Sequence, residues 1–307
     1  MLGLLFSGQG SQYAKMGRDL YDSHAVIREV YDMASEVFGF DVIKESESGE
    51  NFSRTSYSQP CVFTLSISIL EYLKQNGFKY DGTAGFSLGE CTALYGSGIT
   101  TLHDTIKIVN YRSQAMEKAS NEGNGAMAAV LGLSDKAIED ALKGLGGFCV
   151  PVNYNCDGQT VIAGDSEIIE LAEPALKEAG AKRVMRLAVS SAFHTKYMDK
   201  ASLELKENIK DINFSKPSLD FYTNINGKKQ NEIDLPNHLR TQMISPVYFK
   251  AQIENMIKAG YGSFVEIGPE KTLSGFVKRI NKEVNIQNIE NCDSLFRTAS
   301  QEKEIKI

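Results

Sequence analysis

The segment Gly85-Phe86-Ser87-Leu88-Gly89-Glu90 constrains the fold of this 307-residue chain more than any other stretch. It contains the pattern G-x-S-x-G, with a short strand predicted before it over 82–86 and a helix predicted after it over 88–94. A strand, a sharp turn and a helix in this order are typical of a nucleophile elbow, in which a serine stands at the carboxyl end of a strand. A glycine-rich turn with an ordinary serine is the alternative. The flanking strand and helix favour the nucleophile.

The composition excludes several classes of protein. The chain is long enough for one large domain, or for a large domain with a smaller companion. A net charge of −6 argues against a general nucleic-acid binder. The five cysteines form no C-x-x-C pair, which fits unpaired thiols in a reducing compartment better than a disulfide framework or a zinc site. The sequence contains no apolar run of membrane-spanning length and no signal peptide, so we expect a cytoplasmic protein.

The first predicted strand ends in a loop that is suited to a binding site. Residues 2–6 form a continuous apolar run, as in a buried strand, and Ser7-Gly8-Gln9-Gly10 follows it. The two glycines let the backbone turn sharply and present Gln9 at the end of the strand, where open α/β sheets bind ligands. The spacing matches neither a dinucleotide-binding fingerprint nor a P-loop. A polar turn without function is an equal alternative.

Arg112 lies on the apolar stripe of a helix predicted over 101–120, which Thr101 and Asp104 begin in the manner of a capping box. A guanidinium that faces the protein interior is costly unless an anion meets it. An internal carboxylate, or a side chain that extends its charge to the surface, would satisfy this requirement. The functional alternative is a substrate carboxylate held by two parallel hydrogen bonds.

The segment 126–189 has a pattern of its own. Its expected elements are a strand over 126–133, a helix over 134–145, strands over 148–155 and 159–164, a helix over 166–179 and a strand over 182–189. This βαββαβ order is typical of ferredoxin-like domains. We therefore predict an α/β fold with a hydrolase-like large domain, residues 1–123 and 191–307, whose sheet is mainly parallel. A small ferredoxin-like domain, residues 124–190, is inserted into it.

Among the four histidines, His194 is in the best position for a general base. It stands in the small-residue loop Ser190-Ser191-Ala192-Phe193-His194 after a strand, whereas the other three lie in polar or exposed-looking stretches. A loop histidine with purely structural hydrogen bonds fits this position equally well. Elsewhere we expect a helix over 62–74, an irregular segment over 41–58 and a peripheral tail from Asn281.

Six features occur in a fixed order from the first strand to about Ile280. They are Gly8-Gln9-Gly10-Ser11-Gln12, the segment from Gly85 to Glu90, the helix with Arg112, Ala192-Phe193-His194, Gln242 before Pro246-Val247, and Glu266-Ile267-Gly268-Pro269. This ordered set resembles the malonyl-CoA:acyl-carrier-protein transacylases and the related acyltransferase domains of polyketide synthases. The elbow alone is unspecific, but the ordered set is highly specific.

The resemblance implies transfer of a malonyl group from malonyl-CoA to the phosphopantetheine thiol of acyl carrier protein, by a ping-pong mechanism through an ester of Ser87. His194 would act as general base and acid, oriented by the backbone carbonyl of Gln242. The backbone N–H groups of Gln9 and Leu88 would form the oxyanion hole. Arg112 would hold the malonate carboxylate. The other residues implied at the substrate are Phe86, Phe193, Asn155 and Gln59.

The resemblance also implies the partners. These are acyl carrier protein and a coenzyme A thioester, with no metal, no redox cofactor, no nucleic acid and no membrane, and we expect a monomer. Because acyl carrier proteins are acidic, a basic surface is expected to dock them. The candidates are Lys182, Arg183, Lys278 and Arg279. Ordinary solvated charge explains the same four residues equally well.

Three positions depart from the usual family pattern. Phe86 stands where a histidine is usual, Ser113 where a glycine is common and Cys91 where an aromatic residue is common. Two other functions remain open: an acyl-thioester hydrolase of the same fold, and a non-catalytic module that docks carrier proteins. The sequence also leaves open whether the product feeds fatty-acid or polyketide synthesis.

Overall fold

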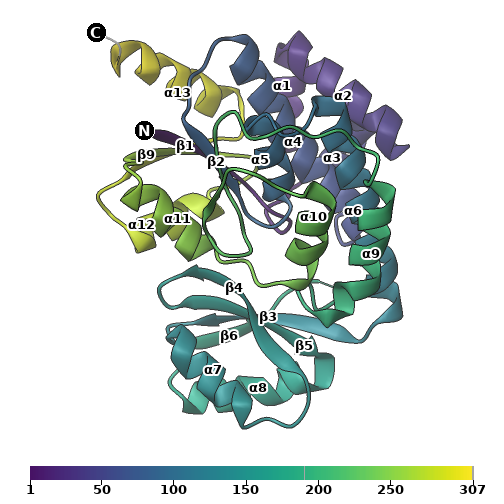
Figure 1. Ribbon diagram of the computed structural model, residues 1–307, viewed down its shortest axis with the longest axis vertical. Coiled ribbons are helices and arrows are strands. Elements are labelled where there is room, and N and C mark those ends of the chain that lie inside the picture. The colour runs from purple at the N-terminus through teal and green to yellow at the C-terminus, as the bar shows by residue number, and fades with distance from the viewer. Residues whose placement is uncertain (190, 306–307) are drawn as a thin grey trace.

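A six-stranded sheet lies at the centre of the upper part of the molecule (Figure 1). The computed structural model describes residues 1–189 and 191–305, of which 299–305 are described by backbone alone; Ser190 and residues 306–307 of the predicted domains lie outside the described residues. The strand order is β10-β9-β1-β2-β7-β8. All neighbouring strands are parallel except β8, which runs antiparallel to β7. The strands are β1 (Leu2–Phe6), β2 (Gly82–Gly85), β7 (Asp220–Tyr222), β8 (Lys229–Gln230), β9 (Ser263–Ile267) and β10 (Asn285–Ile289).

Helices cover both faces of this sheet, which explains why β1 is apolar throughout. Leu4 and Phe6 of β1 pack into the core formed with α2, α4 and α6, whereas Leu5 faces the core formed with α11 and α12. The helices of this part are α1 (Arg18–Ser23), α2 (Ala25–Phe38), α3 (Val42–Ser48), α4 (Thr55–Gln75), α5 (Gly89–Gly96), α6 (Leu102–Glu122), α9 (Asp199–Asn208), α10 (Leu235–Ile244), α11 (Phe249–Lys258), α12 (Thr272–Ile280) and α13 (Cys292–Ile305). None of the helices in the described ranges is both long and apolar enough to cross a bilayer.

A four-stranded antiparallel sheet with two helices forms the lower part of the molecule (Figure 1). Its elements follow the strand–helix–strand–strand–helix–strand order expected for 126–189. They are β3 (Gly125–Leu131), α7 (Asp135–Lys143), β4 (Cys149–Cys156), β5 (Gln159–Asp165), α8 (Ser166–Glu178) and β6 (Arg183–Arg186). The strand order is β4-β5-β3-β6. Ala126, Ala128 and Val130 of β3 face α7 and α8 and share a separate apolar core with them.

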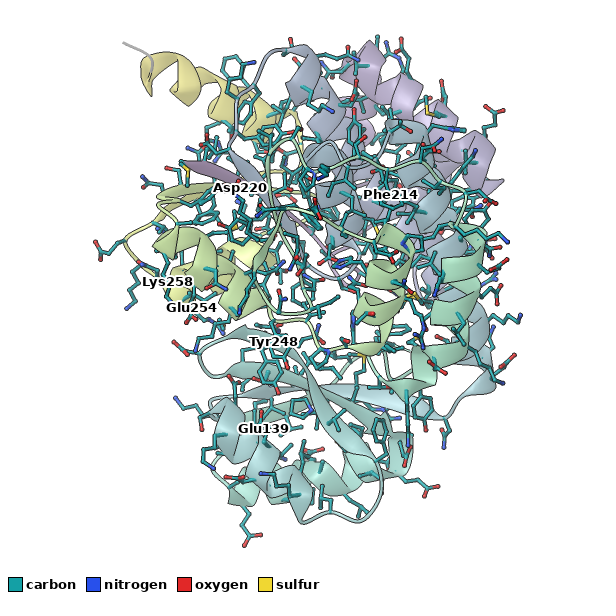
Figure 2. The ribbon with its side chains drawn as sticks, in the orientation of Figure 1. Glu139, Phe214, Asp220, Tyr248, Glu254 and Lys258 are labelled. Atoms are coloured by element: carbon teal, nitrogen blue, oxygen red, sulfur yellow. The ribbon has the colours of Figure 1, made fainter. Side chains whose placement is uncertain are left out.

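Backbone hydrogen bonds join the loop after α10 to β4 of the four-stranded sheet. The N–H of Val247 donates to the carbonyl of Val152 (2.7 Å), and the N–H of Tyr154 donates to the carbonyl of Val247 (2.9 Å). The ring of Tyr154 also stacks on Tyr248, with centroids 4.9 Å apart, and its hydroxyl donates to Glu139 (2.9 Å). Figure 2 shows Tyr248 at this boundary and Glu139 below it. The loop from Ser245 to Val247 is therefore held against β4.

Two sequence-based expectations were wrong. The segment 41–58 is not irregular: it contains α3, and α4 begins at Thr55, so Pro60 lies inside a helix. Tertiary burial explains this, because almost every side chain of α4 before Glu71 is buried. The tail from Asn281 is not peripheral either, since β10 pairs in parallel with β9. β10 was missed because its polar sequence shows no alternating apolar pattern. Its place in the sheet is set by pairing with β9, which the local sequence does not encode.

The elbow depends on close approach of backbone at two glycines. A Cβ atom on Gly89 would lie 2.0 Å from the carbonyl oxygen of Phe6, and one on Gly85 would lie 2.0 Å from the carbonyl carbon of Gly89. Both clashes involve backbone atoms, which cannot move aside as a flexible side chain can. The first turn of α5 is therefore packed directly against the ends of β1 and β2.

We expect Gly89→Ala to lower the free energy of unfolding by at least ~1–3 kcal/mol, because the added methyl group overpacks this contact. Urea denaturation followed by circular dichroism measures the effect. Gly275→Ala in α12 is the matched control, since a Cβ there has no atom within 4 Å. Its helix propensity should make it neutral or slightly stabilising. Equal stability of the two variants would contradict the packing argument.

Candidate active site

Ser87 sits on the sharp turn between β2 and α5, and its backbone is left-handed with φ = 52°. Such a conformation is strained for a residue with a side chain and persists only where the surroundings hold it. The N–H of Phe86 donates to the carbonyl of Phe6 (3.0 Å), and the N–H of Gly89 donates to the carbonyl of Phe86 (2.9 Å). Ser87 is thus fixed at the carboxyl end of the parallel sheet, where its half-buried side chain faces a cavity.

His194 is the hydrogen-bond partner of the Ser87 hydroxyl. Its Nε2 lies 2.7 Å from Ser87 Oγ, and its Nδ1 lies 3.0 Å from the carbonyl oxygen of Gln242 and 3.2 Å from that of Ser245. Carbonyl oxygens only accept, so Nδ1 carries the hydrogen and Nε2 accepts from the serine hydroxyl. Two neutral carbonyls therefore occupy the place that a carboxylate takes in a Ser-His-Asp triad.

The imidazole of His194 is almost completely buried. Burial lowers the pKa of His194 to about 4, and the nearby positive charge of Arg112 acts in the same direction. Hydrogen bonds to the carbonyls of Gln242 and Ser245 oppose the shift. The ring is therefore neutral near pH 7, which is the form that accepts a proton.

Arg112 projects from α6 into the interior, and its side chain has no solvent exposure. Its Nη1 donates to the side-chain oxygen of Gln59 (2.7 Å) and its Nη2 donates to Ser87 Oγ (3.1 Å). Its Nε has no partner in the structure. Burial lowers the pKa of Arg112, and no ion pair within the described ranges includes it. Among the described residues, no carboxylate forms an ion pair with this guanidinium beside the serine hydroxyl; the Cys91 thiol and the buried Glu90 only oppose the lowering of its pKa.

The loop after β1 is tied to Arg112 through Gln59. The amide nitrogen of Gln59 donates to the side-chain oxygen of Gln9 (3.1 Å), and the amide nitrogen of Gln9 donates to Thr55 Oγ1 (3.3 Å). Among the described residues, the backbone N–H groups of Gln9 and Leu88 have no hydrogen-bond acceptor. These two donors are thus free to bind a ligand.

A cavity of about 250 Å³ opens beside Ser87 between the two sheets. Its lining combines the loop after β1 with side chains of β3 and β5 and with Phe193. Phe86 forms part of the wall and packs edge-on against Phe249, with ring centroids 5.7 Å apart. Asn155 also lines the cavity, and its buried side-chain oxygen has no partner among the described residues. The wall is largely apolar, with a few polar groups that can orient a ligand.

The four basic residues singled out from the sequence lie at two elements and differ in their contacts. Lys182 and Arg183 are exposed at the start of β6, and Arg279 donates to Gln159 of β5 (2.6 Å). Gln159 and Arg183 both pair with Leu131 of β3, so these contacts lie at the same end of the four-stranded sheet. Lys278 donates to the carbonyl of Val284 (2.7 Å). Of the four, only Arg279 contacts a residue that lines the cavity.

Sequence reasoning missed Asn224, whose side chain accepts a hydrogen bond from the N–H of Ser87 (2.9 Å). The available signal was a polar residue just after β7, the strand next to β2. It also missed the second carbonyl at His194, that of Ser245. In the parts of the chain that are described, no three His, Cys, Asp or Glu side chains form a group that could hold a metal ion.

Comparison with known proteins gave matches along almost the whole chain. Residues 4–303 match the family model of the acyl transferase domain. The malonyl CoA-acyl carrier protein transacylase of Bacillus subtilis (strain 168) is 35% identical over 313 residues, which cover 99% of this chain and 98% of that protein. The crystal structure of a malonyl CoA-acyl carrier protein transacylase from Clostridium perfringens has a TM-score of 0.93 at 35% identity and covers 99% of this chain and 98% of its own. A malonyl-transacylase in complex with its type II PKS acyl-carrier protein has a TM-score of 0.92 at 32% identity, with 98% and 99% covered.

The low pKa of His194 predicts the pH dependence of Ser87 reactivity. The rate at which a fluorophosphonate modifies Ser87 should be constant above about pH 5 and fall as the pH drops through about 4, because protonated His194 accepts no proton. Intact-mass analysis over a range of about pH 4 to 8 measures this rate. His194→Ala should react slowly, without this titration. A midpoint near the ordinary histidine value of about 6.5 would contradict the effect of burial.

Proposed function

This chain belongs to the acyl transferase family, and from that membership and the geometry of its site we propose that it transfers a malonyl group from malonyl-CoA to the phosphopantetheine thiol of an acyl carrier protein. The observation that carries the proposal is the buried Arg112, whose Nη2 lies 3.1 Å from Ser87 Oγ and which has no carboxylate partner in the described chain. A buried cation beside a nucleophile, without a carboxylate in ion-pair contact, favours a substrate that brings its own carboxylate. The malonyl group does so.

In the first half-reaction, Ser87 Oγ attacks the thioester carbonyl carbon while its proton passes to His194 Nε2. The C–S bond then breaks, the coenzyme A sulfur takes the proton from His194, and malonyl-Ser87 remains. The carrier thiol reverses these steps with its own proton. Each half-reaction exchanges a thioester and an ester, so the chemistry needs no metal or redox cofactor.

The oxyanion of each tetrahedral intermediate is bound by the N–H groups of Gln9 and Leu88. Support comes from their lack of other acceptors among the described residues; in addition, Leu88 directly follows Ser87 in the chain and Gln9 lines the same cavity as Ser87. Loss of one such donor typically costs ~3 kcal/mol of transition-state stabilisation. Gln59 links Arg112 to the loop after β1, because it contacts both Arg112 and the side chain of Gln9.

His194 acts as general base without a carboxylate. The carbonyls of Gln242 and Ser245 fix the Nδ1–H tautomer, and burial keeps the ring neutral before the reaction. A proton on Nε2 is therefore unfavourable, and His194 returns it readily to the leaving sulfur.

The acyl group lies between Arg112 and an apolar wall that includes Phe86 and Phe193. A malonyl carboxylate pairs with the guanidinium, whereas an acetyl group leaves the guanidinium unpaired. Asn155, whose buried oxygen lacks a partner, accepts a hydrogen bond from an amide of the pantetheine arm. Phe86 makes the wall more apolar than the histidine that is usual in the family.

We assign the cavity to the boundary between a hydrolase-like large domain, residues 1–123 and 191–307, and a ferredoxin-like small domain, residues 124–190. The enzyme acts as a monomer.

The acidic carrier docks beside Arg279, which reaches the cavity lining through Gln159. Lys278 is adjacent in sequence, and Lys182 and Arg183 are alternative contacts at the start of β6.

Intact-mass analysis tests the proposed function against the hydrolase alternative. Malonyl-CoA should add one malonyl group to the wild-type protein, and holo acyl carrier protein should then take that group faster than water does. Ser87→Ala should gain no mass, whereas Ser218→Ala, which alters an exposed serine that donates to the backbone carbonyl of Ser97, should be acylated normally. Rapid release of free malonate without malonyl-carrier product would identify a hydrolase instead.

Arg112→Ala tests the carboxylate contact. We expect the kcat/KM for malonyl-CoA to fall by ~10²-fold or more, since the substrate carboxylate loses its buried partner. Activity with acetyl-CoA should rise relative to malonyl-CoA. Arg28→Ala is the control, because Arg28 donates only to the backbone carbonyls of Tyr21 and Asp22. Equal losses with both substrates would exclude a carboxylate-specific role.

A further inference from the structure

Asn224 holds the backbone segment that leads into the strained serine. Its side-chain oxygen accepts from the N–H of Ser87 (2.9 Å), and its side-chain nitrogen donates to the carbonyl of Gly85 (2.6 Å). The same oxygen accepts from the amide of Gln242 (3.1 Å), and the same nitrogen donates to the side-chain oxygen of Gln252 (3.1 Å). Asn224 is fully buried. Each polar atom of its side chain is therefore used, which fixes the orientation of the amide.

Gln242 binds the backbone on the other side of Ser87. Its amide nitrogen donates to the carbonyl of Ser87 (2.9 Å), while its backbone carbonyl orients His194. The N–H and the carbonyl of Ser87 are thus bound by two side-chain amides that also contact each other. These contacts act on the two peptide groups that define the left-handed conformation of Ser87.

A buried acidic residue fixes Asn224 in turn. One carboxylate oxygen of Glu90 accepts from the backbone N–H of Asn224, and the other lies 2.6 Å from Nε2 of His238. Glu90 has no solvent exposure, and the His238 side chain is 10% exposed. The backbone carbonyl of Asn224 accepts from the N–H of Tyr248 (2.9 Å). The position of Asn224 is therefore set by groups from α5, α10 and the start of α11.

We propose that Asn224, held by the buried Glu90–His238 pair, is a positioning residue that keeps Ser87 in its left-handed conformation and its hydroxyl in line with His194. The inference rests on the proposed role of Ser87 as nucleophile. Asparagine suits this position because its amide supplies an acceptor toward the N–H of Ser87 and a donor toward the carbonyl of Gly85. An aspartate supplies two acceptors and faces the carbonyl of Gly85 with an oxygen.

Asn224→Asp tests the proposal through the reaction of Ser87 with a fluorophosphonate. The maximal rate of modification should fall by ~10²-fold, as expected for a misplaced nucleophile, while the concentration of reagent that gives half this rate stays unchanged. Near-UV circular dichroism and thermal unfolding establish that the variant is folded. Asn255→Asp is the matched control, because Asn255 also donates to a backbone carbonyl, that of Gly227 (2.8 Å), away from Ser87. If folded Asn224→Asp reacts as fast as this control, the proposal is overturned.

A second set of variants decides the question if Asn224→Asp does not fold. His238→Ala removes the partner of one Glu90 oxygen at the more exposed end of the network, and we expect a rate about tenfold lower because the remaining buried charge disturbs Asn224. The same substitution should cost less in a Glu90→Gln background, because an unpaired neutral amide is less costly than an unpaired charge. An unchanged rate in His238→Ala overturns the proposal.

This readout separates the inference from the proposed function. The fluorophosphonate reports the reactivity of Ser87 without any malonyl transfer. A wild-type protein that reacts with the reagent but transfers no malonyl group would refute the function and leave the positioning role intact. A wild-type protein that transfers malonyl, together with a folded Asn224→Asp variant of equal reactivity, would refute the positioning role alone.

Discussion

The left-handed backbone of Ser87 is the constraint on which the rest of the site depends. At φ = 52° the serine can stand at the end of β2 only if α5 begins immediately behind it and packs against β1. That packing leaves no room for a side chain at Gly85 or Gly89. The strain is held by contacts from distant parts of the chain, since Asn224 and Gln242 bind the peptide groups of the serine.

Burial lowers the pKa of both side chains that contact Ser87 Oγ, those of Arg112 and His194. The guanidinium of Arg112 and the imidazole of His194 share one desolvated site, so each disfavours a second positive charge nearby. The histidine stays neutral as a result, and two carbonyls suffice to orient it. If Arg112 binds a substrate carboxylate, as proposed, that negative charge would offset the guanidinium and make proton uptake by His194 easier.

The position of each group follows from the parallel sheet and from its junction with the antiparallel one. The loop after β1, the elbow after β2 and Asn224 after β7 meet at one edge because neighbouring parallel strands end there. The Ser245–Val247 loop reaches His194 with a carbonyl while its backbone is bound to β4. The cavity is therefore lined from both sheets.

The sequence alone determined the features that local signals encode. The G-x-S-x-G turn, the capped helix of Arg112 and the ordered motifs predicted an α/β protein of the acyl transferase family, and the family and the helix are confirmed. The roles of the site residues stay predictions. Only the tertiary structure revealed the place of β10 in the sheet and the network that holds Ser87. Asn224 lies 137 positions from Ser87, and His238 lies 148 from Glu90. No local propensity encodes such contacts, because they arise only when strand pairing and helix packing bring distant segments together.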